Sequence, residues 1–115
     1  MRHVEKIFKA LADRNRLRIL KMLQMRPLCV CEITEVMGIA QSSVSRHLGI
    51  LREAGLVDDI KEGQWMIYSL ARGSDDATRS VIVGIKRWLS DDPQIKSDRR
   101  KTRQVNREQL CSKMR

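Results

Sequence analysis

The chain has 115 residues, enough for one domain with its own hydrophobic core, and 42% of them are hydrophobic. It contains one Phe, one Tyr and two Trp, which predicts an aliphatic core of the kind typical of helices. No apolar run reaches the roughly 18 residues of a membrane span, and the N-terminus lacks the apolar segment of a signal peptide. These patterns argue against a membrane or secreted protein and favour a cytoplasmic one, in which the three cysteines serve as ligands, reactive thiols or packing residues rather than as disulfides.

The net charge of +9 favours a polyanionic partner such as DNA, but the charge is uneven along the chain. Residues 96–115 carry +6, whereas residues 1–95 carry only +3. A DNA-binding function for the first part must therefore rest on the positions of particular residues.

Apolar residues recur at helical spacing in the first half of the chain. Asp13 is a candidate N-cap for the second helix, Pro27 ends that helix, and Gly38 suits the left-handed exit of the third. The four predicted helices cover residues 3–12, 14–25, 30–37 and 41–54.

A hairpin and a fifth helix follow. Residues 57–61 and 64–70 are rich in strand formers around a Glu62-Gly63 turn. The helix predicted over residues 76–89 has an apolar face too broad for one small neighbour, which indicates a dimer surface. Past Pro93 the periodicity fades, and this stretch is expected to be mobile or only partly helical.

This order of elements is typical of a winged helix-turn-helix domain. We predict a mainly α (α+β) fold with roughly five helices and a two-stranded β-hairpin wing, assembled as a homodimer. Residues 1–92 would form the DNA-binding and dimerisation domain, and residues 93–115 a basic tail.

The outward face of the predicted fourth helix carries short polar and basic side chains suited to a major groove. An ordinary solvated face, or serines that cap the helix, is the alternative. The candidate DNA contacts are Gln41, Ser42, Ser43, Ser45, Arg46 and His47 in the helix, and Lys61 and Gln64 in the wing.

Four stretches together resemble the ArsR/SmtB family of metal-responsive winged-helix repressors: ADRNRLRILKML, LCVCEI, QSSVSRHLGILREAGLV and EGQWMIYSL. The resemblance covers residues 4 to about 90. It implies a homodimer, formed through the first and last helices of the domain, that blocks a palindromic double-stranded operator without a cofactor and releases it when metal binds.

The same resemblance implies a role for the two cysteines of PLCVCEI. In arsenite- or antimonite-responsive members, cysteines at these positions bind the trivalent ion, which here indicates Cys29 and Cys31. Residues i and i+2 of a regular helix point about 200° apart, so two sulfurs sharing an ion would distort the start of the helix. The arsenic-responsive pattern has a third cysteine where Thr34 stands here, and either Cys111 or an exogenous ligand would have to replace it.

Other uses of these thiols remain open at this stage. Cadmium, lead or thiol oxidation would act on the same sulfurs, and a pair of small buried hydrophobic residues is a further alternative. Zinc sensing is disfavoured because residues 74–92 contain no His. A thiol redox enzyme is a distant alternative, because the spacing is Cys-x-Cys rather than Cys-x-x-Cys.

Overall fold

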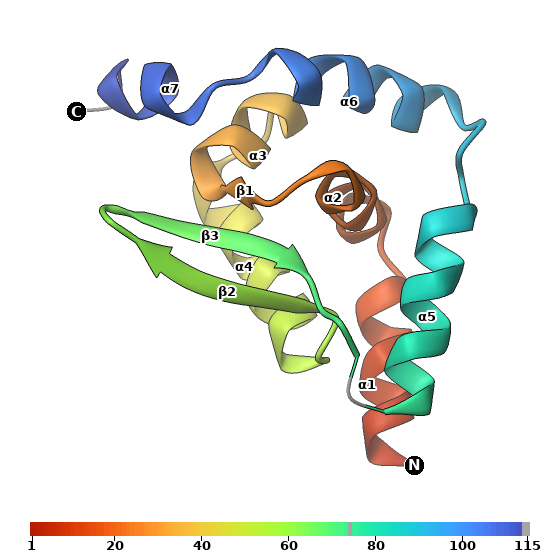
Figure 1. Ribbon diagram of the computed structural model, residues 1–115. Coiled ribbons are helices and arrows are strands. Elements are labelled where there is room, and N and C mark those ends of the chain that lie inside the picture. The colour runs from red at the N-terminus through yellow and green to blue at the C-terminus, as the bar shows by residue number, and fades with distance from the viewer. Residues whose placement is uncertain (74, 114–115) are drawn as a thin grey trace.

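The computed structural model describes residues 1–73 and 75–113, with side chains up to residue 110. Within them it contains seven helices and three strands (Figure 1). In chain order these are α1 (Arg2–Leu11), α2 (Arg14–Met25), β1 (Leu28–Cys29), α3 (Val30–Met37), α4 (Gln41–Glu53), β2 (Val57–Glu62), β3 (Trp65–Leu70), α5 (Asp76–Arg87), α6 (Pro93–Gln104) and α7 (Arg107–Lys113).

The predicted helix boundaries in the first half are confirmed to within one residue, and caps explain the start of α2 and the end of α3. Asp13 accepts a hydrogen bond from the Arg16 backbone N–H (3.1 Å) and begins α2. Gly38 ends α3 with φ 69°, a conformation that costs glycine nothing. The helix-turn-helix pair α3 and α4 therefore lies where the sequence predicted it.

The sheet has three antiparallel strands in the order β1-β3-β2, so the prediction of a two-stranded wing was incomplete. The added strand β1 has only two residues, in which Leu28 pairs with Tyr68 and Cys29 with Ile67. Such a short strand has no periodicity of its own and depends on the neighbouring strand for its conformation. Its consequence is that Cys29 is joined directly to the wing.

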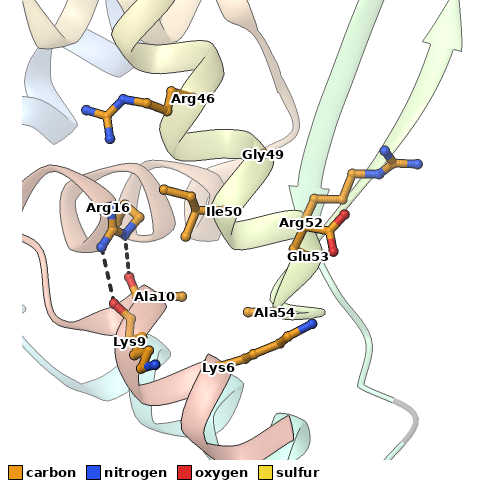
Figure 2. Close-up of a pocket in the computed structure, with 10 residues that line it drawn as sticks. All are labelled: Lys6, Lys9, Ala10, Arg16, Arg46, Gly49, Ile50, Arg52, Glu53 and Ala54. Atoms are coloured by element: carbon orange, nitrogen blue, oxygen red, sulfur yellow. Dashed lines mark hydrogen bonds between the residues drawn. The ribbon is translucent and has the colours of Figure 1, made fainter. Parts of the chain in front are cut away.

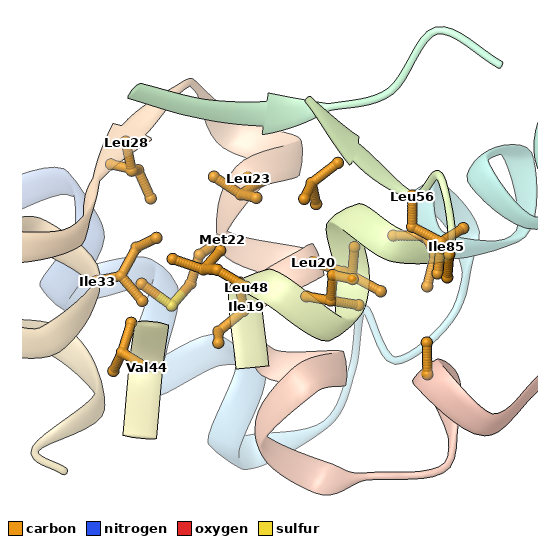
Figure 3. Close-up of a cluster of buried hydrophobic side chains, with 14 of the residues drawn as sticks. Ile19, Leu20, Met22, Leu23, Leu28, Ile33, Val44, Leu48, Leu56 and Ile85 are labelled. Atoms are coloured by element: carbon orange, nitrogen blue, oxygen red, sulfur yellow. The ribbon is translucent and has the colours of Figure 1, made fainter. Parts of the chain in front are cut away.

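One aliphatic core lies between α2, α3, α4, α5 and the sheet (Figure 3). Helix α2 contributes the most residues, since its positions 19–23 are all buried. Ile33 of α3 and Val44 of α4 face each other in this core, and neither is exposed to solvent. A displacement of α3 is therefore felt directly by α4. None of the described helices is long and apolar enough to cross a membrane.

The C-terminal part differs from the expected mobile or partly helical tail, because α6 and α7 are helices that pack against the domain. Helix α6 contacts α2 and α3, and α7 contacts α3. The buried face of α6 consists of Ile95, Asp98 and Thr102, at spacings of three and four residues. Only one of these three residues is apolar, so the sequence of α6 lacks the hydrophobic periodicity by which an amphipathic helix is predicted.

The docking of α6 depends on an ion pair that sequence inspection did not find. Arg18 of α2 donates two hydrogen bonds to the Asp98 carboxylate, at 2.8 and 2.9 Å, and this bidentate contact raises the pKa of Arg18. Gln94 donates a third at 3.0 Å. Asp98 is 1% exposed, so its charge has no solvent to replace a lost partner.

We expect Arg18→Met to lower the free energy of unfolding by about 3–5 kcal/mol, because it leaves the Asp98 carboxylate buried and unpaired. Urea denaturation followed by circular dichroism measures this. Arg18→Met/Asp98→Leu should recover much of the loss, and Arg14→Met, at an exposed position one turn earlier, should change little. An equal, small effect of all three variants would contradict the assigned role of this pair.

Candidate metal centre and nucleic-acid interface

Cys29 lies at the junction between the wing sheet and α3. It is the last residue of β1 and the N-cap of α3, where its backbone is extended (φ −88°, ψ 166°). Its backbone N–H donates to Glu32 Oε1 at 3.0 Å, which forms one half of a capping box. Ladder pairing and capping together fix the backbone of this residue.

The two cysteines pack together against strand β3. Cys29 is 2% exposed and Cys31 is half-buried, and both belong to a small cluster with Ile67 and Trp65 of the wing. The prediction that a regular helix holds the two sulfurs apart was wrong in its premise, because Cys29 precedes the first helical residue. Its side-chain direction is set by the extended N-cap conformation instead.

A third metal ligand beside this pair is not found among the side chains that the structure describes. No cluster of three or more His, Cys, Asp or Glu residues suited to a metal occurs among the residues that the structure describes. The Thr34 hydroxyl is buried without a hydrogen-bond partner among them. The Cys111 side chain lies outside the described residues, although its backbone belongs to α7, which packs against α3.

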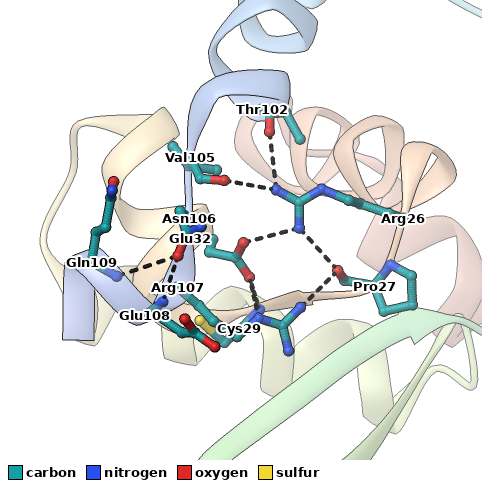
Figure 4. Close-up of polar contacts among 10 residues, drawn as sticks. All are labelled: Arg26, Pro27, Cys29, Glu32, Thr102, Val105, Asn106, Arg107, Glu108 and Gln109. Atoms are coloured by element: carbon teal, nitrogen blue, oxygen red, sulfur yellow. Dashed lines mark hydrogen bonds and ion pairs between the residues drawn. The ribbon is translucent and has the colours of Figure 1, made fainter. Parts of the chain in front are cut away.

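A buried carboxylate beside Cys29 gathers two arginines from distant parts of the chain (Figure 4). Glu32 is 1% exposed; its Oε2 lies 2.9 Å from Arg26 Nη1 and its Oε1 lies 3.3 Å from Arg107 Nε. We call Glu32, Arg26 and Arg107 the Glu32 cluster. Sequence inspection missed it, since only the Cys29-x-x-Glu32 spacing, which resembles a capping box, could have indicated it.

Both arginines of the Glu32 cluster also hold backbone carbonyls. Arg26 donates to the carbonyl oxygens of Thr102 and Val105, each at 3.1 Å, at the end of α6. Arg107 donates to the Pro27 carbonyl at 3.5 Å, and its guanidinium lies 6.0 Å from the centre of the Trp65 ring. The cluster thus connects the start of α3, both C-terminal helices and the wing.

Helix α4 presents a polar face, as predicted. Gln41, Ser42, Ser45 and Arg46 are exposed, whereas Ser43 is half-buried. The N-cap is Ala40, which has no side chain able to cap. The alternative that one of the serines serves as the N-cap is therefore wrong. In the wing, Lys61 and Gln64 are exposed beside the turn at Gly63, whose φ is 61°.

His47 does not share this face, although the sequence analysis placed it among the candidate DNA contacts. It lies on the buried side of α4, where it is 3% exposed, and its Nδ1 accepts a hydrogen bond from Arg16 Nη1 at 3.2 Å. Burial lowers the pKa of His47, with Arg46 and Arg16 acting in the same direction against Asp13. The imidazole is therefore a packing residue and a hydrogen-bond acceptor.

Arg16 of α2 forms hydrogen bonds with both α1 and α4, and Figure 2 shows its two contacts with α1. Besides His47, it donates to the carbonyls of Ala10 (2.7 Å) and Lys9 (3.1 Å) at the end of α1. The pocket between α1 and α4 is lined by Lys6 and Lys9 from one side and Arg46 from the other. This arrangement adds positive charge beside the outward face of α4.

A helix-turn-helix with an exposed polar second helix, followed by a β wing, defines a winged-helix DNA-binding regulator of transcription. Residues 13–59 match the family model described as "Bacterial regulatory protein, arsR family". The arsenic resistance transcriptional regulator ArsR1 of Pseudomonas putida is 38% identical over 91 residues, which cover 75% of this chain and 71% of that protein. The chain therefore belongs to the arsR family of transcriptional repressors.

Two solved structures have the same fold. Reduced HlyU from Vibrio cholerae has a TM-score of 0.64 and 33% identity, covering 76% of this chain and 90% of that one. The homodimeric winged helix-turn-helix domain of Mb0332 from Mycobacterium bovis also has a TM-score of 0.64, with 25% identity and coverage of 79% and 82%. Because the matched family and the Pseudomonas putida relative are transcriptional regulators, the alternative of a thiol redox enzyme is wrong.

Proposed function

We propose that this repressor binds operator DNA as a homodimer and releases it when arsenite or antimonite binds Cys29 and Cys31. The observation that carries the proposal is the position of the cysteine pair, at the joint between the first helix of the reading motif and the wing strand β3. Thiolates prefer soft, thiophilic ions, which suits a trivalent metalloid. The similarity to the arsenic resistance regulator of Pseudomonas putida supports the same inducer.

The proposed switch follows from how tightly Cys29 is held. Its backbone is held by pairing with Ile67 and by the Glu32 cap, so we propose that an ion binding both sulfurs moves the first turn of α3, which carries Cys31, relative to Cys29. Ile33 transmits that movement to Val44 in α4 through the shared core. A coupling of about 1–3 kcal/mol is enough to change operator occupancy by one to two orders of magnitude.

A third ligand completes the proposed coordination of the ion. Cys111 is one candidate, because its helix α7 packs against α3, and an exogenous thiol or hydroxide is the other. Cadmium, lead or oxidation of the thiols would use the same sulfurs. A titration of the operator complex with each agent separates these inducers, and release by peroxide alone would contradict a metalloid sensor.

We expect Cys29→Ser and Cys31→Ser to keep operator binding but to lose release by arsenite. Serine at position 29 preserves the N-cap of α3, so the fold should survive the change. Fluorescence anisotropy of a labelled operator duplex, titrated with arsenite, measures release. Thr34→Ser in the same helix is the matched control, and release of both cysteine variants at the wild-type arsenite concentration would contradict the proposed site.

The proposed DNA contacts are the exposed polar residues of α4 and the wing, with phosphates held by nearby lysines. Gln41, Ser42, Ser45 and Arg46 would enter the major groove, and Ser43 lies at the edge of this face. Lys61 and Gln64 would contact the flanking groove from the wing. Lys6 and Lys9, beside Arg46, are suited to backbone phosphates.

Arg46→Ala should weaken operator binding by about 1–3 kcal/mol, the range for loss of one good base contact. The side chain is exposed, so the melting temperature should stay unchanged. Gel-shift titration at fixed salt measures the affinity, and Arg14→Ala removes the same charge from an exposed site on α2 as a control. Equal affinities of the two variants would remove Arg46 from the interface.

The proposed homodimer uses exposed apolar residues on α1, on α5 and directly after α5; the two helices lie side by side in Figure 1 and are joined by the contact of His3 with Thr78. Phe8 is 65% exposed and Val83 is 56% exposed, while Trp88, which packs over Gly84, is 49% exposed. Val4 and Leu89 are also exposed. This much apolar surface on neighbouring helices suits a second copy of the chain.

Phe8→Glu should convert the dimer into a monomer, because it places two carboxylates in an apolar interface related by twofold symmetry. Sedimentation velocity of the full chain measures the change. Ile60→Glu, at a wing position that is 63% exposed, is the matched control and should remain dimeric. Dissociation by the wing variant alone would place the interface elsewhere.

A further inference from the structure

We propose that Glu32 and Arg107 are positioning residues of the inducer response, through which the C-terminal helices set the inducer concentration at which the repressor releases DNA. The inference rests on the proposed function of the cysteine pair. It assigns a regulatory role to α6 and α7, the part of the chain that the winged-helix motif does not require.

Both carboxylate oxygens of Glu32 are engaged in the interior. Oε2 contacts Arg26 at 2.9 Å, while Oε1 accepts from the Cys29 backbone N–H at 3.0 Å and contacts Arg107 Nε at 3.3 Å. Buried charged groups in such contacts lose several kcal/mol when one partner is removed. The cluster therefore favours one arrangement of the start of α3 strongly.

A single oxygen of Glu32 serves the cysteine segment and the C-terminal helix together. Because Oε1 is shared between Cys29 and Arg107, a movement of the first turn of α3 relative to Cys29 also disturbs the contact with Arg107. Arg107 additionally donates to the Pro27 carbonyl and lies over the ring of Trp65, a residue that packs with the cysteine pair. Through its contacts with Glu32, Pro27 and Trp65, Arg107 thus stabilises the ion-free form of the site.

The direction of the effect follows from this geometry. Closing the two sulfurs around an ion moves the first turn of α3, which carries Glu32, relative to Cys29, so part of the binding free energy is used to open the cluster. Removing the Arg107 contacts lowers that cost. The ion should then bind more tightly, and the repressor should release DNA at a lower inducer concentration.

The test compares full-length wild type with Arg107→Gln, using arsenite as the probe and a duplex selected by the wild-type protein. The arsenite concentration for half-release should fall about fivefold or more, as expected for one charge-assisted contact. Operator affinity without arsenite should stay within about twofold of wild type. Arg107→Lys should restore the wild-type midpoint in part, because an ammonium pairs with Glu32 but cannot span Glu32, Pro27 and Trp65 together.

Arg103→Gln is the matched control. It removes the same charge from an exposed position of α6 and should leave the midpoint unchanged. An unchanged arsenite concentration for half-release in Arg107→Gln would overturn the inference. This holds even if the variant has a lower melting temperature or binds DNA more weakly, because a purely structural role predicts those two changes alone. A fall of the same size in Arg103→Gln would overturn it as well, because net charge would then be the cause.

A second readout separates this inference from the proposed function. Absorbance of the sulfur–arsenic bonds reports arsenite binding without DNA, and Arg107→Gln should bind about fivefold more tightly than wild type. If wild type binds arsenite but stays bound to operator DNA, only the proposed function is overturned. If Arg107→Gln and wild type bind arsenite with equal affinity, only the positioning role is overturned. Absence of arsenite binding by wild type would defeat both.

Discussion

The arrangement of this repressor depends on one buried carboxylate. Glu32 caps the Cys29 backbone at the start of α3 and is itself held by Arg26 and Arg107 from opposite sides. Without it, the N–H at the joint of β1 and α3 would have no capping partner, and the two partly exposed guanidinium groups would lose the carboxylate that they share. The start of the reading motif, the wing and the C-terminal helices are positioned relative to one another by this group.

The parts of the fold with hydrophobic periodicity could be predicted from the sequence. Helices α1 to α4 and the β2-β3 hairpin carry apolar residues at regular spacing, and Asp13 and Gly38 mark their ends. Helix α6 could not be predicted this way, because its buried face uses Asp98 and Thr102 beside a single isoleucine. Strand β1 is too short to carry a period at all, and only its pairing with β3 identifies it.

The candidate site shows the same division. Helical spacing correctly predicted that Ser42, Ser45 and Arg46 are exposed. His47 was placed with them because it is a polar residue, but it lies on the buried side of the helix. Its partner Arg16 is 31 residues away in the chain, so no local pattern connects the two. Arg107 is likewise separated from Glu32 by most of the domain, and long-range polar contacts of this kind leave no trace in local spacing.

Cys29 belongs to two elements of the fold. As the last residue of β1 it pairs with strand β3 of the wing, and it is also the N-cap of α3, the first helix of the helix-turn-helix. Ion binding at its sulfur can therefore act on the wing directly and on α4 through α3. The wing and α4 are the two elements proposed to contact DNA. If the contacts of α4 and of the wing with DNA weaken together, their free-energy losses add and the affinity falls by the product of the two factors. A modest local shift can therefore produce an abrupt rather than a graded departure from the promoter.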